Sequence, residues 1–569
     1  MRVLLLAGLV GLALAASSSS AGPQLNPVQV ENALPGSGGW RNPAAPPHAI
    51  EGYASQTSVA PGDTLELHVS TAPGARYRIE IYRLGWYSGS GGRLLACVPA
   101  SCTDDEAGRA QPEGTPAADG YLDAGWPVTD SLPVPPSWVS GYFLAVLRLT
   151  DGPYAGEAGW APFVVRAPAA RQSRILVQAA VNTWQAYNRW GGLSLYKNQA
   201  GESCKGVCTR VSFNRPYDPT TQNFWQFELP LVHFLEESGY DVSYTTDADT
   251  DRDPAELLRH RLVVVGGHDE YWTKATRDGF DQARSLGTNL AFMGANTGYW
   301  QMRYANGRRT IVEYRVTSLD PETNPALKTI QFRKLVPPRP ECELEGVQYV
   351  RSETESLGGQ HDFAVAPAAL SNSWFASTGF TATSWIPGIV GYEWDAIQPG
   401  CRTPPLTPLF HFGGPPATAD AVRFTAPSGA LVFSAGSLSF AKGLDDFRHH
   451  ADAPASGDPR LEAFVRNAFA DMVRPPGPLA VRTAAGPNGV AVSVRRTADP
   501  RIQAMLVYRA KVRDPLARGS RGLHLVCRTL AARCVDRTVP RGRPVRYVVV
   551  VRDQWGTSVP LVTAPVTGR

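Results

Sequence analysis

A histidine and a glutamate stand two residues apart directly after a run of aliphatic residues. The run is Leu262-Val263-Val264-Val265, and Gly266-Gly267-His268-Asp269-Glu270 follows it. Such a run indicates a strand buried on both faces, as in a parallel sheet. Ligands of open α/β sheets bind beyond the carboxyl ends of the strands, and residues two apart in an extended stretch project to the same side. His268 and Glu270 are therefore candidates for chemistry, although a polar strand end with capping carboxylates is the simpler alternative.

Two further segments carry tyrosines that we expect near the same sheet edge. Tyr187 lies in Thr-Trp-Gln-Ala-Tyr-Asn-Arg-Trp-Gly-Gly (183–192), which follows the buried-strand run at 175–179. Tyr217 lies in Val-Ser-Phe-Asn-Arg-Pro-Tyr-Asp (211–218). Taken singly, tyrosines are more often half-buried packing residues with a hydrogen-bonded hydroxyl. Their order along the chain is what makes them candidates.

The sequence patterns on either side of these residues predict a multi-domain protein with an α/β domain in the centre and an all-β domain at each end. Alternating apolar residues at 64–69, 77–82 and 141–147 favour an N-terminal Ig-like β-sandwich over residues 22–168. Strands and helices then alternate, with helices expected at 230–239 and 254–260, so residues 169–474 form an α/β domain with a mainly parallel sheet, like that of the glutamine amidotransferases. A proline-rich linker at 475–478 opens the third domain, a fibronectin type III-like sandwich assigned to residues 475–569.

The N-terminus is typical of an exported protein. Met1-Arg2, an apolar run to about residue 16 and four serines match a secretory signal peptide, which we place at residues 1–21. The run is too short to span a membrane, and no later stretch is long and apolar enough for a transmembrane anchor. We therefore expect a secreted, extracellular protein.

The eight cysteines are even in number and fall into pairs, which favours disulfides in an exported protein. Zinc is the alternative, but the Cys-x-x-Cys spacing of structural zinc sites is missing. The pairs are Cys97 with Cys102, Cys204 with Cys208, Cys527 with Cys534, and Cys342 with Cys401 over the longest range.

The formal net charge is only +4, and the basic residues are scattered, which excludes a nucleic-acid partner of the usual kind. An arginine excess toward the C-terminus is interpreted as a solvated face in preference to an anionic binding patch. It comprises Arg495, Arg496, Arg513, Arg518 and Arg521.

Together these segments resemble the large (beta) subunit of N,N-dimethylformamidase from about residue 50 to 473. Three more strings contribute to the resemblance: Arg-Leu-Gly-Trp-Tyr at 83–87, Gly-Ala-Asn-Thr-Gly at 294–298 and Gly-Tyr-Glu-Trp-Asp at 391–395. The resemblance implies a hydrolase that acts on the carbon–nitrogen bond of an amide. The export signal, the cysteines and the C-terminal module do not suit dimethylformamide itself, so a small-molecule or peptide-like amide substrate is expected.

The resemblance also implies a mononuclear iron site with two tyrosines and one glutamate as ligands. Carried over, it gives Glu270 and Tyr187 as ligands, with Tyr217 as the second tyrosine and Tyr196 as the alternative. His268 and Asn296 match family residues near the metal and are candidates for catalytic roles, and Glu393 is the candidate for a further catalytic carboxylate. Phenolate and carboxylate oxygens suit Fe³⁺ better than zinc. The family's small subunit is not encoded here and is not assumed as a partner, and a homo-oligomer stays open.

Two alternatives remain at this point. Zinc could bind His268 and Glu270 together with His233 or His361, although no His-Glu-x-x-His motif is present. The chain could also be a non-catalytic extracellular binding or scaffold protein, for example one that recognises glycans. Its modular, exported layout fits this second class as well.

Overall fold

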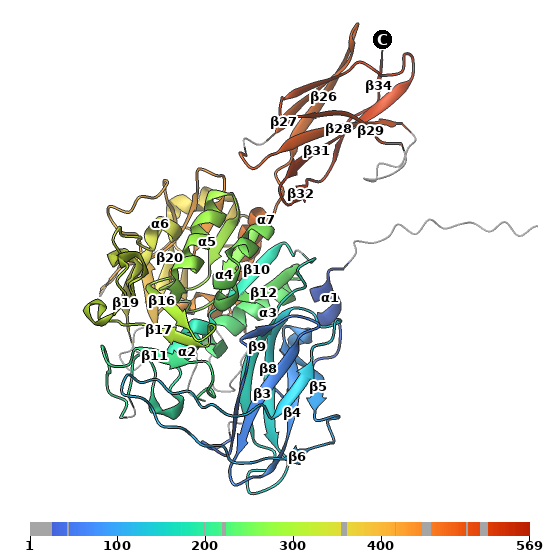
Figure 1. Cartoon of the computed structure of the whole chain (residues 1–569). Helices are drawn as coiled ribbons and strands as arrows, with labels where there is room; N and C mark the ends of the chain where they lie inside the picture. The colour runs from blue at the N-terminus through green and yellow to red at the C-terminus, as the bar shows by residue number, and fades with distance from the viewer. Residues whose placement is uncertain are drawn as a thin grey trace, which may run out of the picture.

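The computed structural model describes residues 25–568 except 42–44, 172, 199, 219–223, 354–360, 416, 447–456, 497–498 and 513–521. The signal peptide expected at 1–21 lies outside the described residues. Figure 1 shows a β-sandwich, a central sheet flanked by helices, and a third β-rich module that carries the C-terminus. Among the described residues, none of the helices has both the length and the apolarity needed to cross a membrane.

The N-terminal part consists of two packed sheets preceded by the short helix α1 (Pro27–Asn32). Alternate residues of the strands, including Leu67, Ile79 and Phe143, form a shared apolar core between the sheets, as the alternating pattern predicts. One sheet has the order β1 (Ile50–Ala54), β3 (Thr64–Thr71), β7 (Asp130–Pro133). The other contains β2 (Ser58–Val59), β9 (Ala158–Val165), β8 (Gly141–Leu149), β4 (Arg76–Leu84) and β5 (Gly92–Val98), with β6 (Glu106–Ala107) beside β4.

The central sheet has nine strands, with a parallel half and an antiparallel half. The prediction of a parallel sheet describes the first half, and the antiparallel half adds to it. The parallel strands are β12 (Val242–Thr246), β10 (Ile175–Ala179), β13 (Leu262–Val265), β15 (Asn289–Phe292) and β25 (Leu431–Ser434). The antiparallel strands are β24 (Ala419–Thr425), β23 (Thr407–Phe412), β20 (His361–Val365) and β21 (Trp385–Val390).

Helices cover both faces of this sheet, which explains the continuous aliphatic runs of its strands. Val264 of β13 belongs to the core that includes α3 (Leu229–Glu237) and α7 (Pro459–Met472). Its neighbours Val263 and Val265 belong to the core on the other face, with α5 (Lys274–Ser285) and α6 (Cys342–Glu345). Further short elements pack at the carboxyl edge of the parallel strands or beside it. They are α2 (Val181–Tyr187), α4 (Asp247–Arg252), β11 (Arg210–Ser212), β14 (Tyr271–Thr273), β16 (Trp300–Ala305), β17 (Thr310–Val312), β18 (Ile330–Gln331), β19 (Gln348–Ser352) and β22 (Glu393–Ala396).

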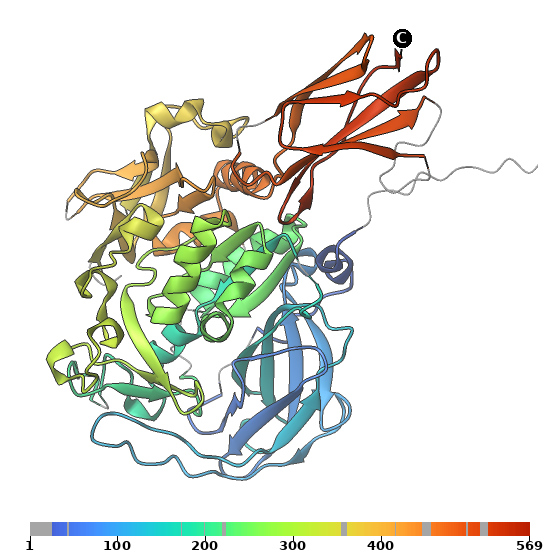
Figure 2. The ribbon, with the colours of Figure 1, turned by 45° about the horizontal axis from the view of Figure 1, so that its top comes forward.

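The C-terminal module is a second two-sheet β structure, visible beyond α7 in Figure 2. Val492, Met505 and Val549 lie in the core between its sheets. The first sheet contains β26 (Pro478–Gly486), β27 (Gly489–Arg496) and β30 (Arg533–Asp536). The second contains β29 (His524–Thr529), β28 (Ala504–Lys511) and β31 (Pro544–Asp553), with β32 (Gly556–Thr557), β33 (Leu561–Val562) and β34 (Val566–Thr567) along β31.

A buried ion pair joins the N-terminal sandwich to the central domain. Arg83 at the end of β4 donates through Nη1 and Nη2 to the two carboxylate oxygens of Glu236 in α3, at 2.8 and 2.7 Å, and neither side chain is exposed. A Cβ atom at Gly85 would lie 2.2 Å from Glu236 Oε2, so glycine is needed there. Asn32 accepts from the backbone amides of Trp86 and Tyr87. The Arg-Leu-Gly-Trp-Tyr string therefore fixes one domain against the other.

Removal of one partner of this pair should destabilise the protein strongly. Arg83→Gln leaves a buried, unpaired carboxylate, and we expect a loss of about 3–5 kcal/mol in the free energy of unfolding. Arg402→Gln is the matched control, because the Arg402 side chain is 85% exposed in its ion pair with Glu343 and should cost at most about 1 kcal/mol. Chemical denaturation measures both, and equal losses in the two variants would contradict the prediction.

All eight cysteines form disulfides, in the pairing that the sequence predicts. The Cys342–Cys401 bond closes the longest loop, with a sequence separation of 59 residues, and ties α6 to the loop before β23. Four disulfides are consistent with an extracellular protein.

Replacement of both Cys342 and Cys401 by alanine should cost about 4 kcal/mol in the chain-entropy model, more than removal of any of the three short-range bonds. The Cys97→Ala, Cys102→Ala variant serves as the control, since its bond spans only 5 residues. The fall in thermal midpoint measures the effect. A larger fall in the control than in the long-range variant would show that the ranking is wrong.

Candidate active site

Two strand-end loops of the central sheet meet in backbone contact. Gly267 follows β13 with a φ of +55°, and Gly294 follows β15. A Cβ atom at residue 294 would lie 1.8 Å from the carbonyl oxygen of Gly267, so only glycine allows this approach. The contact brings the loop of His268 and Glu270 beside the loop of Asn296, as expected for adjacent parallel strands.

Glu270 is buried and receives hydrogen bonds from two phenols. Tyr187, the last residue of α2, donates to Oε2 at 2.9 Å, and Tyr196 from the following loop donates to Oε1 at 2.8 Å and Oε2 at 3.0 Å. The two tyrosine rings stack with centroids 4.5 Å apart. The backbone amide of Glu270 donates to Thr183 Oγ1 at 2.9 Å, which fixes the loop against α2.

Tyr196 has two supports that the sequence interpretation missed. Tyr271 donates from its hydroxyl to the Tyr196 hydroxyl at 2.5 Å, and the Arg315 guanidinium carbon lies 4.1 Å from the centre of the Tyr196 ring. Tyr271 directly follows Glu270 in the chain, so its position beside the cluster had a local signal. Arg315 comes from the chain after β17, and no motif marks it.

His268 and Glu393 form the second half of the site. His268 Nε2 lies 3.1 Å from Glu393 Oε2 and 3.4 Å from Glu270 Oε2, and both carboxylates are almost fully buried. Asn296, which has a φ of +56°, donates from Nδ2 to Glu393 Oε2 at 2.8 Å and from its backbone amide to Asp395 Oδ1 at 2.9 Å. An imidazole between two carboxylates can take up and release protons.

The pKa values of the clustered side chains are shifted because several acidic groups are buried close together. Burial raises the pKa of Glu270, and Glu393 raises it further, while His268 opposes both. Burial raises the pKa of the Tyr187 and Tyr196 phenols well above the usual value, and the Glu270 charge adds to this. Burial lowers the pKa of His268, but the nearby Glu393 and Glu270 carboxylates outweigh it and leave the pKa raised. The site therefore favours added positive charge.

The donor set fits a small hard cation. The phenol oxygens of Tyr187 and Tyr196 each lie 2.8–3.0 Å from a carboxylate oxygen of Glu270. Adjacent oxygen ligands of a small octahedral ion such as Mg²⁺, with bonds of about 2.0 Å, are about 2.8 Å apart. Among the described residues, no group of three or more His, Cys, Asp and Glu side chains is arranged to hold a metal. Ligation at Glu270 would thus depend on the phenols.

The other residues considered from the sequence lie in different surroundings. The Tyr217 ring stacks on Trp160 at 5.6 Å, and both residues line a small cavity beside the N-terminal sandwich. His233 Nδ1 lies 2.9 Å from Asp445, and His361 Nε2 lies 3.2 Å from Glu353 (Oε2). The structure thus brings Tyr187, Tyr196, Glu270, His268, Glu393 and Asn296 together.

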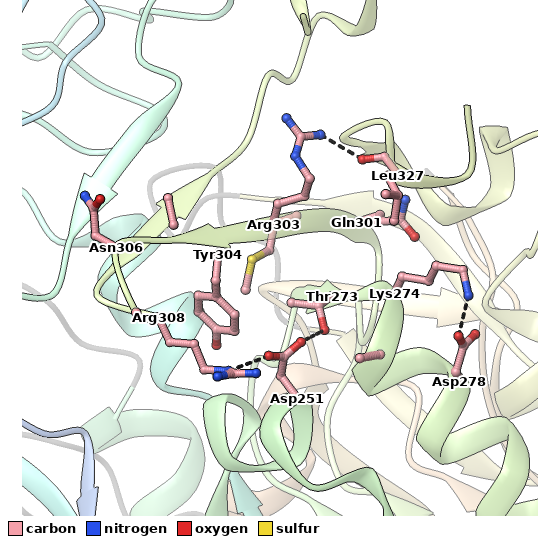
Figure 3. Close-up of a pocket in the computed structure, with 14 residues that line it drawn as sticks. Asp251, Thr273, Lys274, Asp278, Gln301, Arg303, Tyr304, Asn306, Arg308 and Leu327 are labelled. Carbon is pink, nitrogen blue, oxygen red and sulfur yellow. Dashed lines mark hydrogen bonds and ion pairs between the residues drawn. The ribbon is translucent and has the colours of Figure 1, made fainter. Parts of the chain in front are cut away.

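A surface pocket of about 630 Å³ lies beside β16 and the start of α5, and none of the six clustered residues lines it (Figure 3). Four of its charged side chains form two ion pairs: Arg308 donates to Asp251 at 2.6 Å and Lys274 to Asp278 at 2.5 Å. Tyr304 in its wall donates to Asn182, which holds the backbone carbonyl of Tyr271. We regard this pocket as separate from the candidate active site.

Glu228 packs against the loop that follows β13, at Gly267. The carboxyl group, fully buried, accepts hydrogen bonds from Tyr142 at 2.5 Å and from Trp184, and a Cβ atom at Gly267 would lie 2.7 Å from Glu228 Cγ. Burial raises the pKa of Glu228 to about 8, against the hydrogen bonds from Tyr142 and Trp184. The neutral acid is the form that the fold prefers.

Glu228→Gln should change how stability depends on pH. An acid whose pKa is raised in the folded state stabilises the fold below its unfolded pKa, and this contribution is lost as the pH rises from about 4.5 to about 8. Glutamine mimics the neutral acid, so the variant should gain on the order of 2–4 kcal/mol over the wild type between pH 5 and pH 8. Denaturation at both pH values measures this, with the exposed Glu113→Gln as control. Parallel pH profiles for wild type and Glu228→Gln would refute the prediction.

A buried cluster of acids, a base and phenols lies at the carboxyl edge of a parallel sheet, where α/β proteins bind their ligands. This position and chemistry define a candidate enzyme site, and comparison with known proteins is consistent with that class. A model of the family "N,N-dimethylformamidase beta subunit-like, C-terminal" matches residues 78–453. The chain therefore belongs to that family, whose model covers the N-terminal sandwich from β4 to β9 and the central domain as far as residue 453.

Curated relatives match a shorter stretch. The N,N-dimethylformamidase beta subunit of an Alcaligenes species is 28% identical over 96 residues, which are 16% of this chain and 13% of that protein. The beta subunit from Paracoccus aminophilus is 27% identical over 96 residues, which are again 16% of this chain and 13% of that protein. The chain thus aligns with only a small part of these relatives. A solved structure, the twitchin kinase region of C. elegans, is 17% identical over 16% of this chain and 17% of its own, with a TM-score of 0.13.

Proposed function

We propose that this chain is an exported, iron-dependent hydrolase that cleaves the carbon–nitrogen bond of a small amide. The observation that carries the proposal is the convergence of Tyr187 and Tyr196 on the Glu270 carboxylate, at 2.8–3.0 Å, beside the His268–Glu393 pair. All of these side chains come from one chain, so the proposal requires no partner subunit.

In this proposal Tyr187, Tyr196 and Glu270 hold a mononuclear Fe³⁺. Hard anionic oxygens favour trivalent iron over zinc, and the buried acidic groups of the cluster favour a cation. When bound, the ion would polarise the amide carbonyl and lower the pKa of a water molecule. Tyr196 takes the place that the family resemblance gave first to Tyr217, because Tyr196 contacts Glu270 directly.

The proton steps fall to His268 and Glu393. Nε2 of His268 lies 3.1 Å from Glu393 Oε2, so a proton taken from the attacking water can pass between them and reach the leaving amine. Asn296 holds Glu393 through its side-chain amide at 2.8 Å and orients the carboxylate. The Tyr271 and Arg315 contacts hold the Tyr196 ring in place.

The ligand assignment is tested by two matched variants. Tyr196→Phe should lose bound iron and the visible absorption band of a ferric phenolate site, because one of three ligands is gone. Tyr217→Phe, the control, removes the same atom from a tyrosine packed on Trp160 and should keep both. Elemental analysis and visible spectra of the iron-loaded proteins decide. Iron loss in Tyr217→Phe with retention in Tyr196→Phe would reverse the assignment.

The proton roles predict a different phenotype. Glu393→Gln and His268→Asn should keep iron but slow hydrolysis of a responsive substrate by about 10²–10⁴-fold, the usual contribution of general acid–base catalysis. Activity is assayed on a panel of small linear amides that includes N,N-dimethylformamide, with iron content measured in parallel. If Glu393→Gln stripped the iron, Glu393 would be a ligand and the division of roles would be wrong.

A further inference from the structure

The charge of this protein is distributed very unevenly along the chain. Residues 479–569 contain 16 arginines and one lysine but only four aspartates and no glutamate, a formal net charge of +13. The remaining 478 residues carry 38 basic and 47 acidic residues, a formal net charge of −9. The modest total of +4 therefore conceals a strongly basic C-terminal module on an acidic body.

The acids of the module do little to neutralise its surface. Asp536 pairs with Arg509 at 2.9 Å, and Asp499 pairs with Arg501 at 2.8 Å. Asp553 pairs with Arg261 of the central domain at 2.6 Å. The fourth, Asp514, lies outside the described residues.

Three arginines share the outer face of the first sheet of the module. Arg482 of β26 and Arg533 of β30 both stand opposite Ser493 of β27, one on each side, and Arg495 is two residues further along β27. Residues two apart on a strand face the same way, and the core of the module contains Val492 and Val494, so Ser493 and Arg495 face outward.

These three side chains, which we call the arginine face, are exposed. Within the described part of the chain, none of them forms an ion pair with an acidic side chain. Three like charges on neighbouring strands are unfavourable without a partner. A row of outward-facing, uncompensated arginines is therefore a surface for an anion.

The module contacts the central domain at the amino ends of the parallel strands, whereas the candidate active site lies at their carboxyl ends. Arg261, just before β13, forms the buried bidentate pair with Asp553, at 2.6 and 3.1 Å. Trp555 donates from Nε1 to the carbonyl of Leu258 at 3.1 Å, and Arg501 donates to Asn289 at the start of β15. These contacts lie at the amino ends of strands whose carboxyl ends carry the site, and Figure 1 shows the module extending away from the body. A ligand on the arginine face would leave the site uncovered.

We infer that the C-terminal module anchors the protein to an anionic polysaccharide through the arginine face. Guanidinium groups bind carboxylate and sulfate oxygens in bidentate fashion, and arginines spread over a flat sheet suit a polymer with repeated anionic groups. None of the tyrosine and tryptophan side chains described in the module is exposed. The face thus lacks the stacking platforms typical of nucleic-acid binding and the aromatic anchors typical of membrane interfaces.

This inference revises the interpretation of the arginine excess as a solvated face. The sequence showed Arg495 within the excess but could not show that Arg482 and Arg533, 51 residues apart in the chain, flank the same serine. The inference is independent of the proposed hydrolase activity, because it concerns a different module and a different ligand.

The test measures binding of the full-length protein to immobilised polygalacturonate, with neutral dextran as the uncharged polymer, over a series of salt concentrations. The wild type should bind polygalacturonate but not dextran, and its affinity should fall as salt rises. The triple variant Arg482→Glu, Arg495→Glu, Arg533→Glu should bind at least about tenfold more weakly, since favourable contacts become repulsive.

A second triple variant controls for overall charge. Arg109→Glu, Lys205→Glu, Lys334→Glu changes the net charge by the same amount at exposed positions outside the module and should bind polygalacturonate as the wild type does. Both variants should unfold at the same temperature as the wild type, so that a change in binding cannot be ascribed to misfolding.

Three results would overturn the inference. The first is equal binding of the arginine-face variant and the wild type, and the second is equal weakening in the control variant. The third is tighter arginine-dependent binding to phosphatidylglycerol vesicles or to double-stranded DNA than to polygalacturonate, which would assign the face to a membrane or a nucleic acid instead.

Discussion

A buried carboxylate is the constraint on which the candidate active site depends. Glu270 is only 3% exposed, and a charge removed from water must be paired or hydrogen-bonded. Two phenols, Tyr187 and Tyr196, and the His268 imidazole supply those interactions from three separate parts of the chain. The close backbone approach of Gly267 and Gly294 then sets where the second carboxylate, Glu393, can be held by Asn296.

Buried arginine–carboxylate pairs perform the corresponding task between domains. Arg83 with Glu236 fixes the N-terminal sandwich, and Arg261 with Asp553 fixes the C-terminal module. Because a broken pair leaves a buried charge, each junction tolerates little relative motion. The C-terminal module, which carries the arginine face, is therefore attached at the amino ends of the parallel strands, and the proposed catalytic centre lies at their carboxyl ends.

The local patterns in the sequence predicted much of this fold. Aliphatic runs at 175–179 and 262–265 became β10 and β13, and the helix expected at 230–239 is α3. His268 and Glu270 were found because they follow such a strand, and Asn296 was found through the family resemblance, whereas Tyr196 lies in a loop without periodicity. Its place depends on Arg315, 119 residues later. Arg83 was seen only as part of a string, since its partner Glu236 is 153 residues away.

We propose that one iron ion lies between Tyr187, Tyr196 and Glu270. Anomalous diffraction from crystals of the iron-loaded protein, collected at the iron absorption edge, locates such an ion directly. A single strong peak is expected between the Glu270 carboxylate and the two phenol oxygens. A peak elsewhere, or no peak there in protein that elemental analysis shows to contain iron, would contradict this placement of the metal.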